Sequence, residues 1–133
     1  MTKEEHVKYW KESADESWES ALYLAKGKHF SLCLFALHLT LEKLLKALWI
    51  KESVTDTPPY THDLQKLSEE LQLDISPEDF DYLTIVNNWN IRGRYPDYTS
   101  RLNKKTTGKY LEVQIAKIDT IKKWLEEKIS KKK

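Results

Sequence analysis

The chain has 133 residues and a formal net charge of +1, because 22 lysines and arginines nearly balance 21 aspartates and glutamates. A chain of this length is expected to form one domain, residues 1–133, with a core of its own. The balanced charge excludes the overall positive field that holds nucleic acid non-specifically, so any contact with RNA or a nucleotide must be local.

Glycine and proline are scarce, with three and four copies, and they stand where helices should stop, which is typical of an all-α protein. The single cysteine, Cys33, lies among apolar residues and has no second cysteine to pair with, which favours a core residue in a reducing compartment. The stretch 1–10 is charged and has no apolar signal segment. We therefore expect a cytoplasmic protein without a membrane anchor.

The first expected helix lies between Thr2 and Gly27. Thr2 can cap its start, and Glu4 and Glu5 place negative charge at the positive end of the helix. Apolar residues then recur every three or four positions: Trp10, Ala14, Trp18, Ala21, Leu22 and Ala25. Gly27 predicts the helix stop and a tight turn, which makes the next helix an antiparallel neighbour.

The stretch from Phe30 to Ile50 is the one around which the chain is organised. Its first half is almost entirely apolar, and its second half carries leucines at helical spacing. The run is too long for a strand, and its charges interrupt it too often for a membrane span. We expect a central, mostly buried helix that ends near Glu52, before the prolines of the next loop.

Two helices are expected after this loop. Thr61 or Asp63 can cap a short third helix, whose buried face contains Leu64, Leu67 and Leu71. Ser76 and Pro77 form a strong start signal for a fourth helix, which ends near Tyr95 because a proline follows. The buried stripe of the fourth helix is Phe80, Leu83, Val86 and either Trp89 or Asn90.

The polar stretch 97–108 has no periodicity and predicts an exposed loop. Thr106 or Thr107 can open the last helix, and the lysines of 131–133 are expected to form a solvated end. The core positions of the last helix are Leu111, Ile118, Ile121, Leu125 and Ile129, with Trp124 beside them. The predicted fold is an all-α, up-and-down helical bundle of four long helices plus a short helix between the second and fourth.

A charged group interrupts the central helix. Glu42 and Lys46 are four residues apart in the order that favours an intrahelical ion pair, which stabilises a helix by a few tenths of a kcal/mol. His38 lies one turn earlier, and Lys43 adds a second amine. A surface ion pair explains these residues, and so does a site that faces the fourth helix.

The stretch 87–98 breaks the rules of its helix, because asparagines, arginines and a glycine are poor helix formers there. Arg92 and Arg94 offer planar donor forks that suit phosphate or carboxylate, and Tyr95 offers a ring on which a base can stack. A structural ion pair between Arg94 and Asp97 that fastens the helix end is the alternative explanation.

Other chemistry is not indicated. No two histidines have metal-ligand spacing with a third ligand, so a structural zinc site is rejected. The sequence has no Gly-rich phosphate loop and no cysteine or serine with an evident activating base. We expect no metal and no cofactor.

Four landmarks in this order carry a family resemblance: Phe35 and His38 with the run 42–48, a proline-rich loop, Thr61-His62-Asp63-Leu64, and Arg94-Tyr95-Pro96-Asp97. Together they resemble the HEPN domain, the nucleotide-binding domain shared by higher eukaryotes and prokaryotes, over about residues 5–128. The resemblance implies a helical bundle that is commonly a homodimer. It also implies frequent association with a minimal nucleotidyltransferase as a toxin and antitoxin pair.

Many members of that family are metal-independent ribonucleases that use an arginine and a histidine four to six spacer residues apart. No histidine follows Arg92 or Arg94 within that reach, so the resemblance is to a branch that bears RYPD instead. It implies the fold and a binding role but not the catalysis. The expected ligand-binding residues are His38, Glu42, Lys43, Lys46, His62, Arg92, Arg94, Tyr95 and Asp97.

The leading hypothesis is a homodimer that binds a nucleotide, RNA or a nucleotidyltransferase partner through a groove between the second and fourth helices. One alternative is a ribonuclease in which His38 or His62 replaces the missing histidine. The other is a structural adaptor. Dimerisation is expected because Tyr9, Trp10 and Trp18 exceed what one narrow buried stripe needs.

Overall fold

The computed structural model describes residues 1–53, 55–94 and 108–131, with the backbone alone for 91–94. Within these ranges the chain forms five helices and no strand. They are α1 (Lys3–Lys26), α2 (Phe30–Glu52), α3 (Leu64–Glu70), α4 (Pro77–Arg94) and α6 (Gly108–Ser130). The predicted all-α bundle, with a short helix between the second and fourth long helices, is confirmed.

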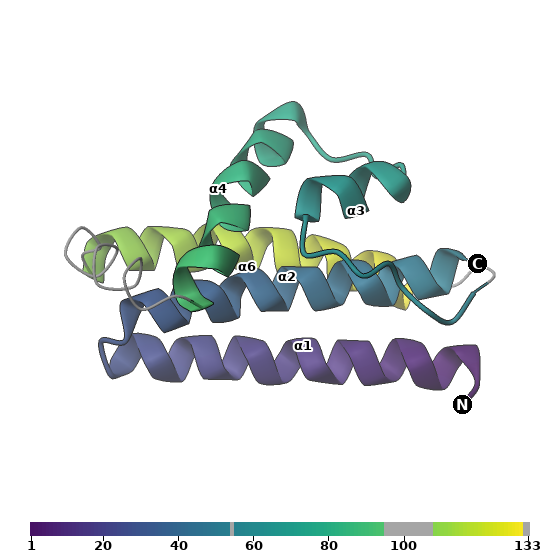
Figure 1. Ribbon diagram of the computed structural model, residues 1–133, viewed down its shortest axis with the longest axis horizontal. Coiled ribbons are helices and arrows are strands. Elements are labelled where there is room, and N and C mark those ends of the chain that lie inside the picture. Colours follow the sequence, from purple (N-terminus) through teal and green to yellow (C-terminus); the bar gives the residue numbers. More distant parts are fainter. Residues whose placement is uncertain (54, 95–107, 132–133) are drawn as a thin grey trace.

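The helices are arranged around α2. Figure 1 shows α1, α2 and α6 lying along the long axis, with α3 and the steeply inclined α4 on the other side of α2 from α1. Each of the other four described helices contacts α2. The side chains of α2 are buried on several faces, as expected for a central helix.

The turn between α1 and α2 differs in detail from the prediction. Thr2 caps α1 as expected, and its hydroxyl accepts the backbone N–H of Glu5 at 3.1 Å. Gly27 ends α1 with a φ of −81°, and the left-handed conformation falls instead on Lys28, with a φ of 62°. A Cβ atom on Gly27 would lie 2.9 Å from the ring of His29. Gly27 therefore permits a close approach rather than a left-handed turn.

The core lies where α2 meets α1, α4 and α6. Its fully buried members include Leu34, Leu37, Leu41, Leu44, Val86, Ile118 and Leu125. Cys33 belongs to this core, and burial raises the pKa of its thiol to about 11. The thiol is therefore neutral at physiological pH, as expected for a small core residue.

Local capping sets where α3 and α4 begin. The carboxylate of Asp63 accepts the backbone N–H groups of Gln65 and Lys66 at the start of α3. The hydroxyl of Ser76 accepts the backbone N–H of Asp79 at 3.1 Å, with a proline as the first residue of α4. Both predicted start signals are confirmed.

The end of α6 is fastened to the bundle by charged side chains. The amine of Lys51 in α2 donates to the backbone carbonyl oxygens of Lys128, at 2.6 Å, and of Lys131. These contacts place a cation at the negative end of α6. The amine of Lys11 lies 3.0 Å from the carboxylate of Glu126, which joins α1 to α6.

Part of the sequence-based prediction lies outside the described residues. This part includes Thr106 and Thr107 as the start of the last helix, Tyr95 as the end of the fourth helix, and the predicted loop 97–108 except for Gly108, which is the first residue of α6. Among the helices that are described, none combines the length and the apolar character needed to cross a membrane.

Candidate functional site

Glu42 lies in α2, and its carboxylate is the centre of a buried polar cluster. Its Oε2 accepts a hydrogen bond from Nζ of Lys46 at 3.1 Å, and its Oε1 accepts one from Nδ1 of His62 at 2.8 Å. Nδ1 of His38 lies 3.7 Å from the same Oε1. The exposed fractions of the Glu42 and Lys46 side chains are 6% and 8%. We call His38, Glu42, Lys46 and His62 the Glu42 cluster.

His62 is held in the cluster both by its ring and by its backbone. Nε2 of His38 donates to the carbonyl oxygen of His62 at 2.9 Å, since a carbonyl can only accept. The side chain of His38 is fully buried, whereas 53% of the His62 side chain is exposed. Because Nδ1 of His62 donates to the carboxylate, Nε2 of its neutral ring is an acceptor, and no described residue donates to it.

Asn87 joins α4 to the same corner of the molecule. Its Oδ1 accepts the backbone N–H of Leu64, and its Nδ2 donates to Oδ1 of Asp63, both at 2.9 Å. The hydroxyl of Thr61 accepts the backbone N–H of Asp63 at 3.1 Å. The segment 61–64 is therefore fixed by α2 on one side of His62 and by α4 on the other.

The two lysines of the central helix have different partners. Nζ of Lys46 lies 5.7 Å from the ring centroid of Trp10 in α1, as well as beside Glu42. Nζ of Lys43 instead donates to the hydroxyl of Ser17 in α1 at 2.7 Å. Burial lowers the pKa of Lys43, although nearby carboxylates oppose this. The two lysines predicted to bind the ligand together therefore have different neighbours. Lys46 belongs to the Glu42 cluster, whereas Lys43 is hydrogen-bonded to α1.

The predicted residues of the fourth helix can be located only in part. Arg92 and Arg94 lie in the last turn of α4, and the position of their backbone is described. Their side chains, together with Tyr95 and Asp97, lie outside the described residues. Their role as ligand-binding residues, and the alternative ion pair between Arg94 and Asp97, stay predictions.

Comparison with known protein families assigns the chain. A scan against protein-family models matches the HEPN domain over residues 7–128. The chain belongs to the HEPN family. A search of curated proteins and a search of solved structures each found no match. The match includes all of α2, α3 and α4, and it leaves out only the first residues of α1 and the last residues of α6. The resemblance to the family inferred from the sequence is therefore confirmed.

The chemistry available to this HEPN domain follows from the contacts of the Glu42 cluster. Both oxygens of Glu42 accept hydrogen bonds from side chains, so its carboxylate is placed to orient Lys46 and His62. His62 is the member of the cluster that is both fixed and exposed. Among the residues described, no group of three or more His, Cys, Asp or Glu side chains is arranged to hold a metal ion.

Sequence reasoning missed Asn87 and Trp10 as parts of this site. Asn87 stands in the stretch that breaks helix propensity, so an asparagine inside an expected helix was an available signal. Its partners in the segment 61–64 are more than twenty residues away and could not be inferred. Trp10 looked like a core or interface residue, and its contact with Lys46 depends on how α1 packs on α2.

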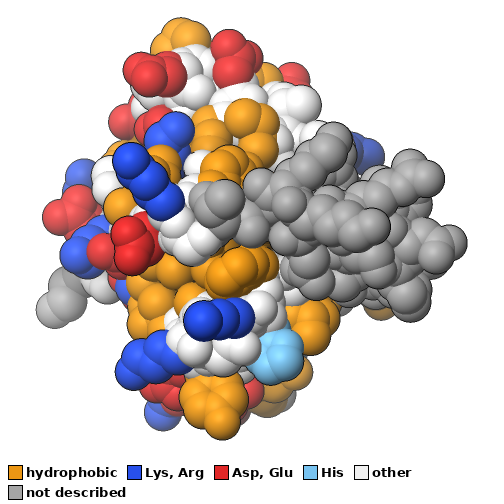
Figure 2. Space-filling view, turned by 90° about the vertical axis from the view of Figure 1, so that its left-hand side faces the viewer, with side chains coloured by type: hydrophobic (Ala, Val, Ile, Leu, Met, Phe, Trp, Pro, Cys, Tyr) orange, Lys and Arg blue, Asp and Glu red, His pale blue; other side chains and the backbone are white. Residues whose placement is uncertain are grey.

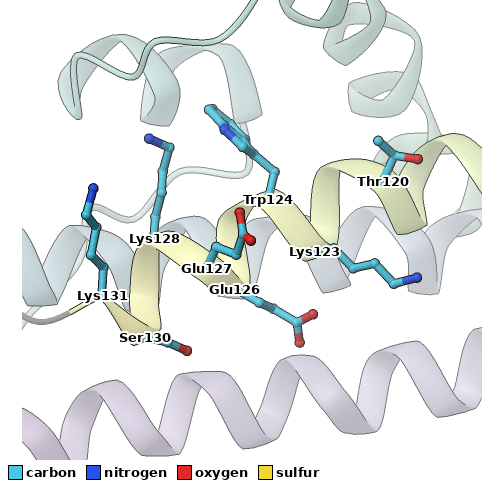
Figure 3. A pocket seen from close by; sticks show the side chains of 8 residues that line it. All are labelled: Thr120, Lys123, Trp124, Glu126, Glu127, Lys128, Ser130 and Lys131. Carbon is cyan, nitrogen blue, oxygen red and sulfur yellow. The ribbon is translucent and has the colours of Figure 1, made fainter.

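A hollow on the outer face of α6 is separate from the Glu42 cluster. Figure 3 shows that side chains of α6 line it, with Trp124 and Lys128 pointing to the same side of the helix. Nζ of Lys128 lies 4.8 Å from the ring centroid of Trp124 and 2.7 Å from the carboxylate of Asp74. Because its charges are mixed and its residues come from one helix and its end, we assign it no function.

Proposed function

We propose that this HEPN domain binds a nucleotide or RNA at the corner formed by α2, the segment 61–64 and α4. The observation that supports this best is the ring of His62, which is half-exposed yet fixed by a buried carboxylate. Side chains that bind ligands tightly are held in place by neighbours before the ligand arrives. Glu42 and His38 of α2 and Asn87 of α4 supply such support to this segment.

The burial of charge in the cluster also favours a role beyond stability. Glu42 and Lys46 are both nearly buried, and removing two charges from water has a large desolvation cost. Apolar residues of similar volume often stabilise a core equally well or better. Retaining a carboxylate, an amine and two imidazoles at one place is therefore typical of a site that uses them.

The two arginines of α4 complete the proposed site. Arg92 and Arg94 would meet phosphate groups, Tyr95 would stack on a base, and Asp97 would orient an arginine. Lys46 would add local positive charge, whereas Lys43 would first have to leave its bond with Ser17. The missing histidine after the arginines argues against cleavage by the mechanism of the family's nucleases.

Partners form a second part of the proposal. We propose a homodimer and association with a minimal nucleotidyltransferase in a toxin and antitoxin type of system. Trp10 and Trp18 each lie under a lysine of their own chain, so they offer less free surface than the sequence implied. Figure 2 shows apolar side chains at the end of the bundle where α1 meets α2. Exposed apolar residues of the helix ends there are Leu22, Tyr23, Leu32, Tyr110 and Val113.

A structural adaptor is the second candidate function. It is favoured by the same contacts, because the Glu42 cluster and Asn87 join three elements whether or not a ligand binds. The nuclease alternative now depends on His62 alone, since His38 is fully buried and cannot reach RNA.

The test is a binding titration of ATP, GTP and a short single-stranded RNA, followed by thermal unfolding at saturating ligand. A ligand at about a hundred times its Kd stabilises the fold by roughly 2.7 kcal/mol, which is several degrees in Tm. We expect binding by the wild type, and loss of binding in Arg94→Ala and Lys46→Ala. The control is Lys123→Ala, because the Lys123 side chain is 71% exposed on α6, away from the cluster.

Three other outcomes separate the alternatives. Absence of binding to all three ligands would favour the adaptor. Equal binding by the wild type and both site variants would place the ligand elsewhere. Shortened RNA after incubation in EDTA would support the nuclease alternative.

Light scattering at micromolar concentration tests the proposed homodimer, and a monomer at that concentration would contradict it.

A further inference from the structure

The ring of His62 is held by hydrogen bonds although more than half of the side chain is exposed. Its Nδ1 donates to the buried Oε1 of Glu42 at 2.8 Å, and the carbonyl oxygen of the same residue accepts from His38 at 2.9 Å. Ring and backbone are thus fixed from within the protein, while 53% of the side chain remains exposed. The second ring nitrogen, Nε2, receives no hydrogen bond from the described residues.

We propose that His62 is a phosphate-binding residue that acts in its protonated form, and that Glu42 is its positioning residue. This inference rests on the proposed function and names the group that would meet the ligand. A neutral ring would offer Nε2 as an acceptor, which repels a phosphate oxygen. A protonated ring donates from both nitrogens, so Nδ1 keeps Glu42 while Nε2 donates to a phosphate oxygen.

The groups around His62 are consistent with this assignment. From α2, Glu42 contacts the ring directly, Lys46 contacts the other oxygen of that carboxylate, and His38 contacts the backbone carbonyl of His62. Asp63, on the same segment, is engaged with the start of α3 and with Asn87 of α4. The cationic partner of Glu42 keeps the inner part of the cluster near neutral, so protonation of His62 gives a net positive charge at its exposed edge.

The consequence is a coupling between binding and proton uptake. Histidine is the side chain whose unperturbed pKa, about 6.5, lies nearest to physiological pH. If the bound form carries one more proton than the free form, Kd rises by up to about tenfold for each pH unit above that range. Phosphate binding at this site should therefore be strong at mildly acidic pH and weaken as the pH rises.

The experiment measures Kd by fluorescence anisotropy for a short single-stranded RNA with a hydroxyl group at both ends. Its phosphodiesters do not titrate between about pH 5.5 and 8.5, whereas a terminal phosphate has a second pKa near 6. A pH dependence of Kd then belongs to the protein. The same titration with ATP and GTP shows whether the protein takes free nucleotides instead.

His62→Asn is the decisive variant, because the asparagine amide can replace Nδ1 as the donor to Glu42 and leaves nothing in place of Nε2. We expect wild-type Kd to rise at least threefold from pH 6 to pH 8. His62→Asn should bind more weakly at pH 6, with a Kd that no longer depends on pH. Glu42→Gln keeps the shape of the side chain and should reduce the pH dependence while leaving some binding.

The control is His29→Asn, which removes another exposed histidine outside the cluster and should retain the wild-type pH dependence. Thermal unfolding of each variant checks that it is folded. A wild-type Kd that does not change with pH, or a His62→Asn variant that still shows the change, would overturn the role of His62 while leaving the proposed binding function intact. RNA cleavage lost in His62→Asn would show a proton-transfer role instead. No binding of RNA or nucleotide at any pH would overturn both proposals.

Discussion

The Glu42 cluster and the outer face of α6 both collect charged residues, but they are organised differently. In the Glu42 cluster, His62 of the segment 61–64 contacts both Glu42 and His38 of α2, and the side chains of Glu42 and Lys46 are nearly buried. On α6, Lys123 pairs with Asp119 four residues earlier on the same helix, and its side chain is 71% exposed. The comparison indicates that the burial of charged groups, rather than charge alone, distinguishes the candidate site.

The largest effect on stability is expected when the Glu42 carboxylate is removed. Glu42→Ala leaves the amine of Lys46 buried without its ionic partner, and breaking a buried pair on one side typically costs about 3–5 kcal/mol. We expect a loss of that order in the free energy of unfolding, measured by urea denaturation. The matched variant Glu127→Ala, on the exposed face of α6, should change it by less than about 0.5 kcal/mol. Similar losses in both variants would remove the distinction between the regions.

The next largest effect is expected at the contact between α4 and α3. Asn87→Ala leaves the backbone N–H of Leu64 without its acceptor, which costs about 1–3 kcal/mol where the group is buried. Hydrogen exchange of that amide should become faster. Asn88→Ala, on the adjacent exposed position, is the control. Unchanged exchange at Leu64 would show that the asparagine does not fix the segment beside His62.

A smaller effect separates the two lysines of α2. Lys43→Ala removes the bond to Ser17, and a hydrogen bond of this kind contributes about 0.5–1.5 kcal/mol to stability. A double-mutant cycle with Ser17→Ala should recover a coupling energy in this range. The affinity for RNA or a nucleotide should change little, because the amine of Lys43 is bonded to Ser17 of α1 and lies outside the Glu42 cluster. A loss of affinity as large as that in Lys46→Ala would contradict this division.

The smallest effect is expected on α6. Lys128 lies 2.7 Å from Asp74, and this contact lowers the pKa of the exposed Asp74 carboxyl. A carboxyl group with a depressed pKa stabilises the folded state above its unfolded pKa, and this contribution is lost as the pH falls through the folded value. Lys128→Ala should therefore shift the unfolding midpoint only slightly at neutral pH. The shift should vanish in acid or in high salt.

The sequence predicted what local physical chemistry determines. Thr2 and Ser76 cap helices because their hydroxyls meet backbone N–H groups three residues later. The pairing of Glu42 with Lys46 follows from helical spacing. The family resemblance includes His62 among the expected ligand-binding residues, but helical spacing could not reveal its hydrogen bond to Glu42, because a proline-rich loop separates the two residues.

Two further details depended on packing that no local rule describes. Lys43 and Lys46 are nearly adjacent on a helical surface, and only the position of α1 decides that one meets Ser17 and the other Trp10. In the turn after α1, the left-handed conformation falls on Lys28, and the ring of His29 lies against Gly27. Neither the separate neighbours of the two lysines nor the close contact within the turn follows from helical spacing.

The short turn between α1 and α2 has a consequence for the order of folding. It lets these two helices meet across a few residues, whereas Glu42 and His62 are 20 residues apart in sequence and Leu64 and Asn87 are 23 apart. Closing a longer loop costs more chain entropy, so contacts near in sequence tend to form first. We expect the α1–α2 hairpin to form early and the Glu42 cluster to close late. A nascent or partly folded chain would then lack the proposed ligand-binding corner until α4 has docked.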